Sequence, residues 1–257
     1  MAAISYDSQA ILKDFAERHK IDIPLLADSD SVIIRSFNVL NTEATGMTKG
    51  MAYPGFFYID TSGIIREKYF TVKYTDRLTA NNVVAKLFPE LIEEVKQNVE
   101  APHLKLTLAQ SDRSVIAGAR VSLIAEIELP PDVHVYSPGV TGYKPIQLTL
   151  YEISGVEFHP VSYPSSRNLY LEAIKEHVPV YEGRFRLSQD VTVTPSKLRD
   201  GISSVPSSNK AISITGELAY QVCDKTICYP PRSVPVKYQL EVIPLDLKRS
   251  PEAIRHK

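Results

Sequence analysis

The chain has 257 residues, 44% of them hydrophobic, so it can bury a sizeable core, and its length predicts two domains rather than one. Its 29 basic and 30 acidic residues leave a net charge of −1, which excludes the basic surface needed to bind nucleic acid or an anionic membrane. No apolar run approaches the ~20 residues of a membrane span, and the N-terminus lacks the charged and apolar regions of a signal peptide.

Residues 1–99 alternate short apolar runs with helical patterns. Behind the candidate caps Asp7 and Ser8, apolar residues recur at spacings of three and four, which predicts an amphipathic helix. Aromatic and β-branched residues around a Thr61-Ser62-Gly63 turn predict a β-hairpin. The other predicted elements are a short buried strand at 21–28, a short helix at 29–37 and a helical run at 78–99 that Pro89 kinks or restarts. This order of elements predicts an α/β layer.

The sequence pattern changes at about residue 100, where runs that alternate apolar and polar residues replace the helical patterns. The alternating runs are separated by clusters of Pro, Gly, Asp and Ser, and they lie at 119–129, 144–153, 178–187, 210–220 and 233–243. Short strands at regular spacing predict an antiparallel β-sandwich. We therefore expect a domain boundary at residues 99–103 and a sandwich over 103–244, followed by a basic, solvated tail at 245–257.

The two cysteines, Cys223 and Cys228, are the candidate reactive groups of the chain. None of the six histidines lies nearby at ligand spacing, so a zinc site is disfavoured. A disulfide that closes so short a loop stabilises the folded state only slightly. A redox-active pair is therefore favoured over a structural disulfide. Within the loop, the positive charge of Lys225 favours the thiolate form of a cysteine and the negative charge of Asp224 disfavours it. The sequence does not tell which effect is larger. A purely structural bridge and two inert buried thiols remain the alternatives, and no glycine-rich phosphate loop predicts a cofactor.

The segment around these cysteines resembles a known family. The stretch ITGELAYQVCDKTICYPP, together with HVYSPG and PVYEGRFRL, is similar to the N-terminal periplasmic domain of the thiol:disulfide interchange protein DsbD. The resemblance covers residues 103–244 and implies an immunoglobulin-like sandwich that exchanges electrons with thioredoxin-fold dithiol proteins. It implies that Cys228 is the exchange cysteine and Cys223 the resolving cysteine. This chain has one residue fewer between the cysteines than the best-known member.

The same resemblance implies supporting residues around the pair. It places His134 and Tyr136 beside the cysteines, where a histidine can stabilise a thiolate, and it makes Tyr220 the aromatic residue of the cysteine motif. The alternative for His134 and Tyr136 is simple packing or solvent exposure. A cap loop over the cysteines is expected from residues 169–177, with Leu171 or Ile174 as the covering side chain.

Residues 1–99 resemble the later part of a peroxiredoxin of the alkyl hydroperoxide reductase and thiol-specific antioxidant type, a thioredoxin-like fold. Residues 2–37 and 53–70 carry this resemblance. It implies a reactive cysteine upstream of these segments, whereas residues 1–222 contain none, so we expect this domain to be silent as a peroxidase. The resemblance also implies that Pro54 follows a cis bond, with an ordinary trans proline at the start of a strand as the alternative.

A domain without its opening strands is expected to leave apolar sheet surface uncovered. We expect the chain to be either a fragment, whose catalytic cysteine lies upstream of Met1, or a degenerate scaffold that docks partners.

The sequence thus predicts a truncated thioredoxin-like α/β domain followed by an immunoglobulin-like antiparallel β-sandwich. The predicted function is that of a thiol-disulfide oxidoreductase acting through Cys223 and Cys228, without metal or cofactor. The alternatives are a fragment of a peroxiredoxin-like antioxidant enzyme and a non-catalytic partner-binding module with a structural disulfide. By resemblance alone we expect a periplasmic location; the sequence predicts no oligomeric state.

Overall fold

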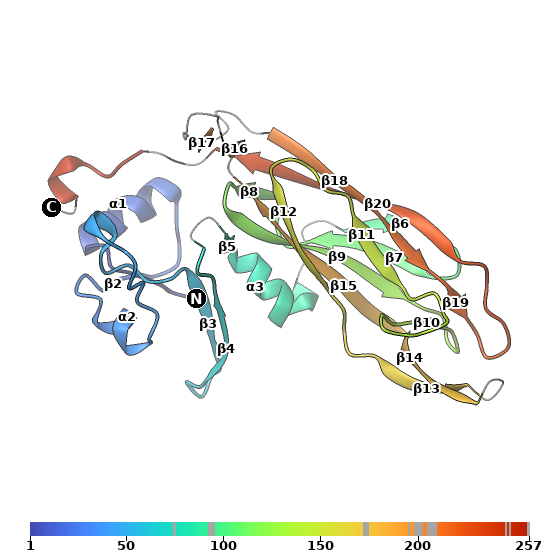
Figure 1. The fold of residues 1–257 in the computed structure, drawn as a ribbon. Helices are drawn as coiled ribbons and strands as arrows, with labels where there is room; N and C mark the ends of the chain where they lie inside the picture. Colours follow the sequence, from blue (N-terminus) through green and yellow to red (C-terminus); the bar gives the residue numbers. More distant parts are fainter. Residues whose placement is uncertain are drawn as a thin grey trace. The chain divides into compact units, whose positions relative to one another are not determined.

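The chain divides into one unit formed by Met1–Tyr74 with Asp246–Lys257 and a second unit formed by Thr75–Leu245. The computed structural model describes residues 1–73, 76–91, 96–171, 175–194, 196–197, 203–204, 210–244, 246 and 248–255. The prediction of a boundary at residues 99–103 is therefore wrong, because residues 76–99 belong to the β-rich unit. Figure 1 labels the elements of both units.

The first unit begins with a small β-α-β arrangement. Strands β1 (Ala3–Ser5) and β2 (Leu25–Ala27) pair in parallel on either side of helix α1 (Gln9–His19). The hydroxyl of Ser8 caps this helix by accepting a hydrogen bond from the amide of Ile11 at 3.4 Å, as the sequence predicts. Strand β2 is only half-buried, with Leu26 46% exposed, so the expectation of a buried strand is wrong.

The rest of this unit is a short helix and a separate hairpin. Helix α2 (Val32–Ser36) begins where the Asp28 carboxylate accepts hydrogen bonds from three amides of its first turn. After the 3-10 turn η1 (Gly46–Thr48), strands β3 (Gly55–Ile59) and β4 (Ile65–Phe70) form the predicted hairpin. The N-terminal segment is therefore α/β, as predicted, and among the described residues its hairpin and its β1–β2 pair form two separate sheets.

Pro54 precedes strand β3, and no peptide bond of the described residues is cis. The expectation of a cis bond at Pro54 is therefore wrong. The carbonyl of Pro54 accepts a hydrogen bond from the amide of Thr71 at 3.1 Å, which extends the ladder between β3 and β4. Pro54 is thus the trans proline at the start of a strand that the sequence left as the alternative.

The first unit exposes many large apolar side chains, in agreement with the expected uncovered apolar surface. Within residues 1–73 these exposed side chains are Met1, Ile4, Phe15, Leu26, Val32, Ile33, Phe37, Ile59, Ile64, Ile65 and Val72. The core of this unit is correspondingly small: Leu12 and Ile34 are its buried apolar residues among those described. Most of the stability of the chain must therefore reside in the second unit.

The C-terminal residues pack on helix α1 instead of forming the predicted solvated tail. The guanidinium of Arg18 lies 2.6 Å and the imidazole of His19 lies 2.9 Å from the carboxylate of Asp246. The 3-10 turn η3 (Glu252–Ile254) follows. The Arg18 guanidinium in the last turn of α1 also interacts favourably with the helix dipole. Arg18 and His19 together bind an acidic residue of the C-terminal segment, which a count of tail charges does not reveal.

The segment before residue 100 joins the second unit through polar contacts. Strand β5 (Arg77–Leu78) pairs with strand β9 (Ala119–Glu128), and helix α3 (Ala80–Leu87) covers the outer face of β9. The fully buried amide of Asn82 donates hydrogen bonds to Ser122 at 2.9 Å and to Asp190 at 3.1 Å. The helix ends before Pro89, which begins the 3-10 turn η2 (Pro89–Leu91), and β6 (Gln97–Val99) is a strand rather than the predicted end of a helix.

Two sheets face each other across the main core of the second unit (Figure 1). The first sheet has the order β12-β15-β9-β7-β6, with β5 beside β9, and the second has the order β11-β18-β20-β8. The strands not yet bounded are β7 (Lys105–Gln110), β8 (Ser114–Ile116), β11 (Gln147–Leu150), β12 (Val156–Ser162), β15 (Arg184–Val193), β18 (Lys210–Tyr220) and β20 (Arg232–Ile243). The alternation predicted from sequence is clearest in β20, where every second residue is buried.

A third, smaller sheet extends from this core and carries the cysteines. Its order is β13-β14-β10-β19, from β13 (Arg167–Leu171), β14 (Glu176–Glu182), β10 (His134–Tyr136) and β19 (Val222–Cys223). The short pair β16 (Ser196–Lys197) and β17 (Ser203–Ser204) completes the described strands. The antiparallel β-rich unit is therefore as predicted, although it begins earlier in the chain.

Candidate functional site

Cys223 and Cys228 form a disulfide across a narrow hairpin that continues strand β18. Their Cα atoms are 4.0 Å apart, and the two residues form a β-bridge. The amide of Tyr229 donates a hydrogen bond to the carbonyl of Val222 at 2.8 Å, which closes the hairpin next to the disulfide. The hairpin backbone therefore holds the two cysteines side by side.

The two cysteines differ in exposure. Cys223 is 1% exposed and packs in a cluster with Tyr136, Val178 and Val180, which belong to the neighbouring strands β10 and β14. Cys228 is exposed, beyond the end of the third sheet. A large reactant can therefore approach the disulfide from the side of Cys228, while Cys223 is covered.

The structure brings Tyr136 to the disulfide. Its hydroxyl lies 3.9 Å from Sγ of Cys228, although the residue is only 1% exposed. The ring stacks on Tyr143, with ring centroids 4.4 Å apart. Burial, followed by the neighbouring Tyr143, raises the pKa of Tyr136 above its ordinary value, so the hydroxyl keeps its proton at neutral pH and is available to donate to sulfur.

His134 lies two residues before Tyr136 on strand β10, directly across the β10–β19 ladder from Cys223. Its ring meets that of Tyr136 edge-on, and its Nε2 atom is buried with no hydrogen-bond partner among the described residues. Burial lowers the pKa of His134, although the charges of Glu182 and Asp224 act in the opposite direction. The imidazole is therefore uncharged at neutral pH and can act on a thiol only as a hydrogen-bond partner.

The lowered pKa of His134 predicts a loss of stability in acid. Because the unfolded chain binds a proton at a higher pH than the folded chain, the stability contributed by the neutral ring is present above the ordinary value of 6.5 and is lost as pH falls through the lower folded pKa. His134→Phe should therefore reduce the difference in unfolding free energy of the oxidised protein between about pH 7.5 and about pH 5, measured in urea. His177→Phe, at an exposed histidine, is the control; an unchanged difference in the His134 variant contradicts the prediction.

The residues between the cysteines form a turn organised by one carboxylate. Oδ1 of Asp224 accepts hydrogen bonds from the amide of Thr226 at 2.7 Å, its hydroxyl at 2.7 Å and the amide of Ile227 at 2.9 Å. These bonds, led by the amides of Ile227 and Thr226, lower the pKa of Asp224 to about 2. Lys225 lies 2.6 Å from Asp132, an exposed carboxylate outside the loop. Asp224 and Lys225, whose charges were expected to have opposite effects on a thiolate, thus both interact with groups other than sulfur.

The segment predicted to form a cap loop is the β13–β14 hairpin. Leu171 ends strand β13 and packs against the cluster that contains Cys223 and Tyr136. Ile174, the alternative covering residue, lies outside the described residues. Leu171 is therefore near the pair, but as a strand residue rather than a loop residue.

Tyr220 does not join the disulfide cluster. Its ring lies in the main core between the two larger sheets, and its hydroxyl donates a hydrogen bond to the carbonyl of Pro102 at 3.0 Å. Tyr220 therefore packs in the main core at the end of β18, and it is not part of the disulfide cluster. Two residues that sequence reasoning missed are Tyr143, in a loop with no periodic signal, and Tyr229, whose ring stacks on His103 at 4.2 Å.

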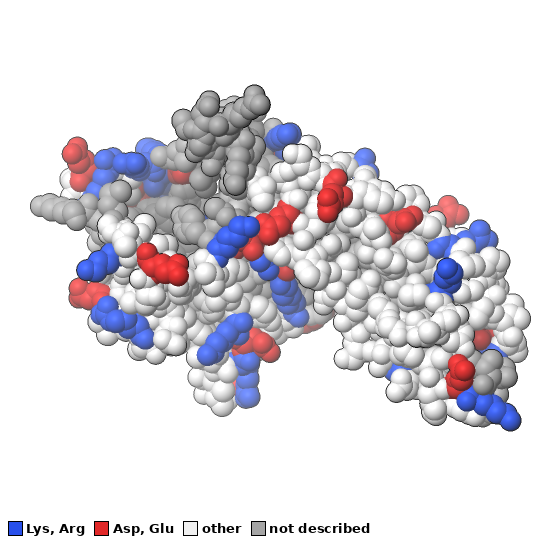
Figure 2. All heavy atoms as spheres, viewed as in Figure 1, with Lys and Arg blue, Asp and Glu red and all other residues white. Residues whose placement is uncertain are grey.

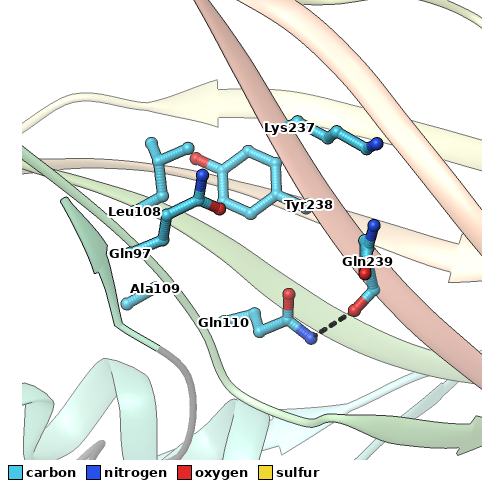
Figure 3. A pocket seen from close by; sticks show the side chains of 7 residues that line it. All are labelled: Gln97, Leu108, Ala109, Gln110, Lys237, Tyr238 and Gln239. Carbon is cyan, nitrogen blue, oxygen red and sulfur yellow. Dashed lines mark hydrogen bonds between the residues drawn. The ribbon is translucent and has the colours of Figure 1, made fainter. Parts of the chain in front are cut away.

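Outside the disulfide, the described residues show a cavity but no cluster of metal ligands. They contain no group of three or more His, Cys, Asp or Glu side chains that could hold a metal ion. A cavity of about 290 Å³ opens between strands β7 and β20, where the Gln110 amide donates to the carbonyl of Gln239 (Figure 3). Its lining includes Tyr238 and neither cysteine, so it is separate from the disulfide.

On the face shown in Figure 2, the described basic and acidic side chains are interspersed rather than gathered by sign. No helix in the described part of the chain is long and apolar enough to cross a bilayer.

Comparison with known proteins identifies a family for each part of the chain. Residues 1–68 match the AhpC/TSA family, and residues 105–239 match the family described as thiol:disulfide interchange protein DsbD, N-terminal. No curated protein matches the chain. Both family resemblances predicted from the sequence are thus confirmed, the first over a shorter stretch than residues 1–99.

One solved structure similar to the chain is the N-terminal periplasmic domain of ScsB from Proteus mirabilis. It is 14% identical, with a TM-score of 0.35, and the match covers 57% of this chain and 49% of that chain. The chain thus spans about half the length of that structure. The match to the DsbD N-terminal family, in contrast, covers more than half of the 257 residues and includes both cysteines. The chain therefore belongs to the family of the N-terminal domain of the thiol:disulfide interchange protein DsbD.

Proposed function

We propose that this chain is a thiol-disulfide oxidoreductase that exchanges electrons with thioredoxin-fold dithiol proteins through Cys223 and Cys228. The observation that carries the proposal is the unequal exposure of the two bonded cysteines, one exposed and one 1% exposed. An exchange reaction needs one sulfur that a partner can reach and a second sulfur that stays close enough to release the partner. A bridge that only stabilises the fold needs neither property.

The proposed reaction proceeds through a mixed disulfide on Cys228. In the reduced chain, the Cys228 thiolate attacks a disulfide of the partner, forms an S–S bond to one partner sulfur and releases the other as a thiolate that takes up a proton. The Cys223 thiol then loses its proton and attacks Sγ of Cys228, which releases the second partner sulfur. Two electrons and two protons pass to the partner, and the Cys223–Cys228 bond re-forms.

The residues around the disulfide support this chemistry. The protonated hydroxyl of Tyr136, 3.9 Å from Sγ of Cys228, can donate a hydrogen bond to a thiolate when the disulfide opens. The uncharged His134 ring, opposite Cys223, can accept a hydrogen bond from the resolving thiol before that thiol gives up its proton to solvent. Leu171 packs over this cluster and keeps water from Cys223 until a partner binds.

The remaining expectations about fold and location form part of the same proposal. Two sheets around one core support an immunoglobulin-like sandwich, and the β-α-β arrangement of the first unit supports a thioredoxin-like origin. Residues 1–222 contain no cysteine, so within this chain we assign the redox chemistry to the second unit. A stable disulfide is easiest to keep in an oxidising compartment such as the periplasm.

The proposal is tested by electron transfer to an oxidised thioredoxin-fold protein. The reduced full chain, freed of reductant, should convert the partner disulfide to thiols while its own two thiols disappear, as counted by alkylation and mass spectrometry after an acid quench. The variant with both Cys223→Ser and Cys228→Ser should transfer nothing. Binding of the partner by that variant, with no transfer by the natural chain, would instead support the partner-binding module.

A further inference from the structure

We propose that Asp224 is a positioning residue for the thiol-disulfide reaction, because its carboxylate holds the loop between the two cysteines in the shape required for disulfide closure even when the disulfide is reduced. This inference rests on the proposed function and assigns a device that sets the balance between the dithiol and disulfide forms. Among the described residues, the hydrogen-bond partners of the Asp224 carboxylate are Thr226, Ile227 and Tyr229, and neither sulfur is one of them.

The geometry that carries the inference is a turn closed by a side chain. The amide of Asp224 donates to the carbonyl of Ile227 at 2.9 Å, which leaves Lys225 and Thr226 as the tip of the turn. The amide of Ile227 donates to Oδ1 of Asp224 rather than to its carbonyl. The carboxylate therefore performs the closing role that a backbone carbonyl performs in an ordinary hairpin turn.

The same carboxylate reaches both ends of the loop. Oδ1 accepts two hydrogen bonds from Thr226 as well as the one from Ile227, and Oδ2 accepts a longer one, 3.5 Å, from the hydroxyl of Tyr229. Tyr229 directly follows Cys228, and Asp224 directly follows Cys223. The hydrogen bonds of one side chain thus tie the residue after the first cysteine to the residues on both sides of the second.

This arrangement has a direct consequence for the redox equilibrium. Closing a disulfide costs the conformational entropy of bringing two thiols together, and a loop that is already held in the closed shape pays less of that cost on oxidation. In the disulfide form the covalent bond restrains the loop by itself. Loss of the Asp224 hydrogen bonds should therefore increase the conformational entropy of the loop more in the dithiol form than in the disulfide form. The dithiol form is then favoured, so the disulfide becomes easier to reduce.

The experiment measures the equilibrium of the full chain with glutathione, in which the two thiols and oxidised glutathione exchange with the disulfide and two reduced glutathiones. Asp224→Ala removes every acceptor, and we expect the equilibrium to move about tenfold towards the dithiol, equivalent to about 30 mV for a two-electron couple. Asp224→Asn removes the charge but keeps the Oδ1 acceptor, and it should stay within about twofold of the natural chain. Asp132→Asn, which removes the exposed carboxylate beside Lys225 and none of the bonds inside the loop, is the matched control.

The outcomes separate positioning from charge and from stability. A shift in Asp224→Ala with rescue by Asp224→Asn supports the proposal, whereas equal shifts in both variants show a charge effect and overturn it. No shift in Asp224→Ala also overturns it, as does a loss of thermal stability in the oxidised form that accounts for the whole effect. Because glutathione replaces the protein partner, a failed transfer to a thioredoxin-fold protein would refute the proposed function without changing this result.

Discussion

Cys223→Ser is expected to trap a thioredoxin-fold partner as a covalent complex. The exposed Cys228 thiolate of this variant can still attack a partner disulfide and form the mixed disulfide. The thiol that would attack Cys228 and release the partner is absent, so the complex accumulates instead of turning over. On a non-reducing gel, the natural chain should show a small or undetectable fraction of complex, and the variant should convert most of its monomer to a band that reductant dissolves.

Cys228→Ser is the matched control for this result. Its remaining thiol, Cys223, is 1% exposed beneath Tyr136, Val178 and Val180, so a partner cannot reach it without disruption of the third sheet. We expect at least about tenfold less complex than with Cys223→Ser, because the thiolate must be accessible to react. Equal trapping by both variants, or trapping only through Cys223, would reverse the assignment of the exchange cysteine while leaving thiol exchange itself intact.

Arg120→Ala is expected to cause the largest loss of stability, about 3 kcal/mol, because it removes the main partner of a buried carboxylate. Asp76 is 5% exposed, and its carboxylate accepts a hydrogen bond from Nε of Arg120 at 2.8 Å and a second from Nη2. The hydroxyl of Thr192 donates to the same carboxylate at 2.6 Å. Without the guanidinium, the charge of Asp76 stays buried, and its remaining neighbours among the described residues are the Thr192 hydroxyl and the His159 imidazole, whose Nε2 lies 3.9 Å from Oδ1 of Asp76.

Two further variants make this prediction specific. Lys105→Ala removes one partner of an exposed ion pair with Glu128, and it should cost far less stability than Arg120→Ala, since solvent screens such pairs. Asp76→Asn combined with Arg120→Met removes both charges and should recover most of the stability lost in Arg120→Ala. Urea unfolding of the oxidised chain gives all of these free energies. A loss in Arg120→Ala no larger than in Lys105→Ala would mean that the pair does not stabilise the fold.

The interaction between Asp76 and Arg120 also makes the stability of the fold depend on pH in acid. Although burial by itself raises the pKa of Asp76, the hydrogen bonds from Arg120 and Thr192 and the charges of Arg120 and His159 lower it below the ordinary value of 3.8. Because the folded pKa is depressed, this contribution to stability is present above the ordinary value and is lost as pH falls through the folded pKa. As pH falls, its loss therefore begins at a lower pH than the loss of the His134 contribution, because the ordinary values are 3.8 and 6.5.

Local patterns in the sequence determined much of this protein. Alternation at period two in β20 and β9 identified the strands of the β-rich unit, because successive side chains of a strand point to opposite faces. The Ser8 cap and the Thr61-Ser62-Gly63 turn are equally local, since each depends on hydrogen bonds within a few residues. The short separation of Cys223 and Cys228 in sequence made a bond between them possible, and the hairpin seen in the structure brings them together.

Contacts between distant segments decided what local patterns could not. The sequence pattern of helix α3 predicts that it ends the α/β domain. The side-chain amide of Asn82, however, donates hydrogen bonds to Ser122 and Asp190, so the helix belongs to the β-rich unit. Likewise, Cys223 is buried and Cys228 exposed only because strands β10 and β14 cover one side of the hairpin. Burial and pairing are properties of chain segments that meet in space, and their partners lie dozens of residues apart, whereas periodicity and turn chemistry report only on near neighbours. The sequence alone therefore determined the strands, the turns and the cysteine pair, and the tertiary structure decided the domain boundary and which sulfur a partner can reach.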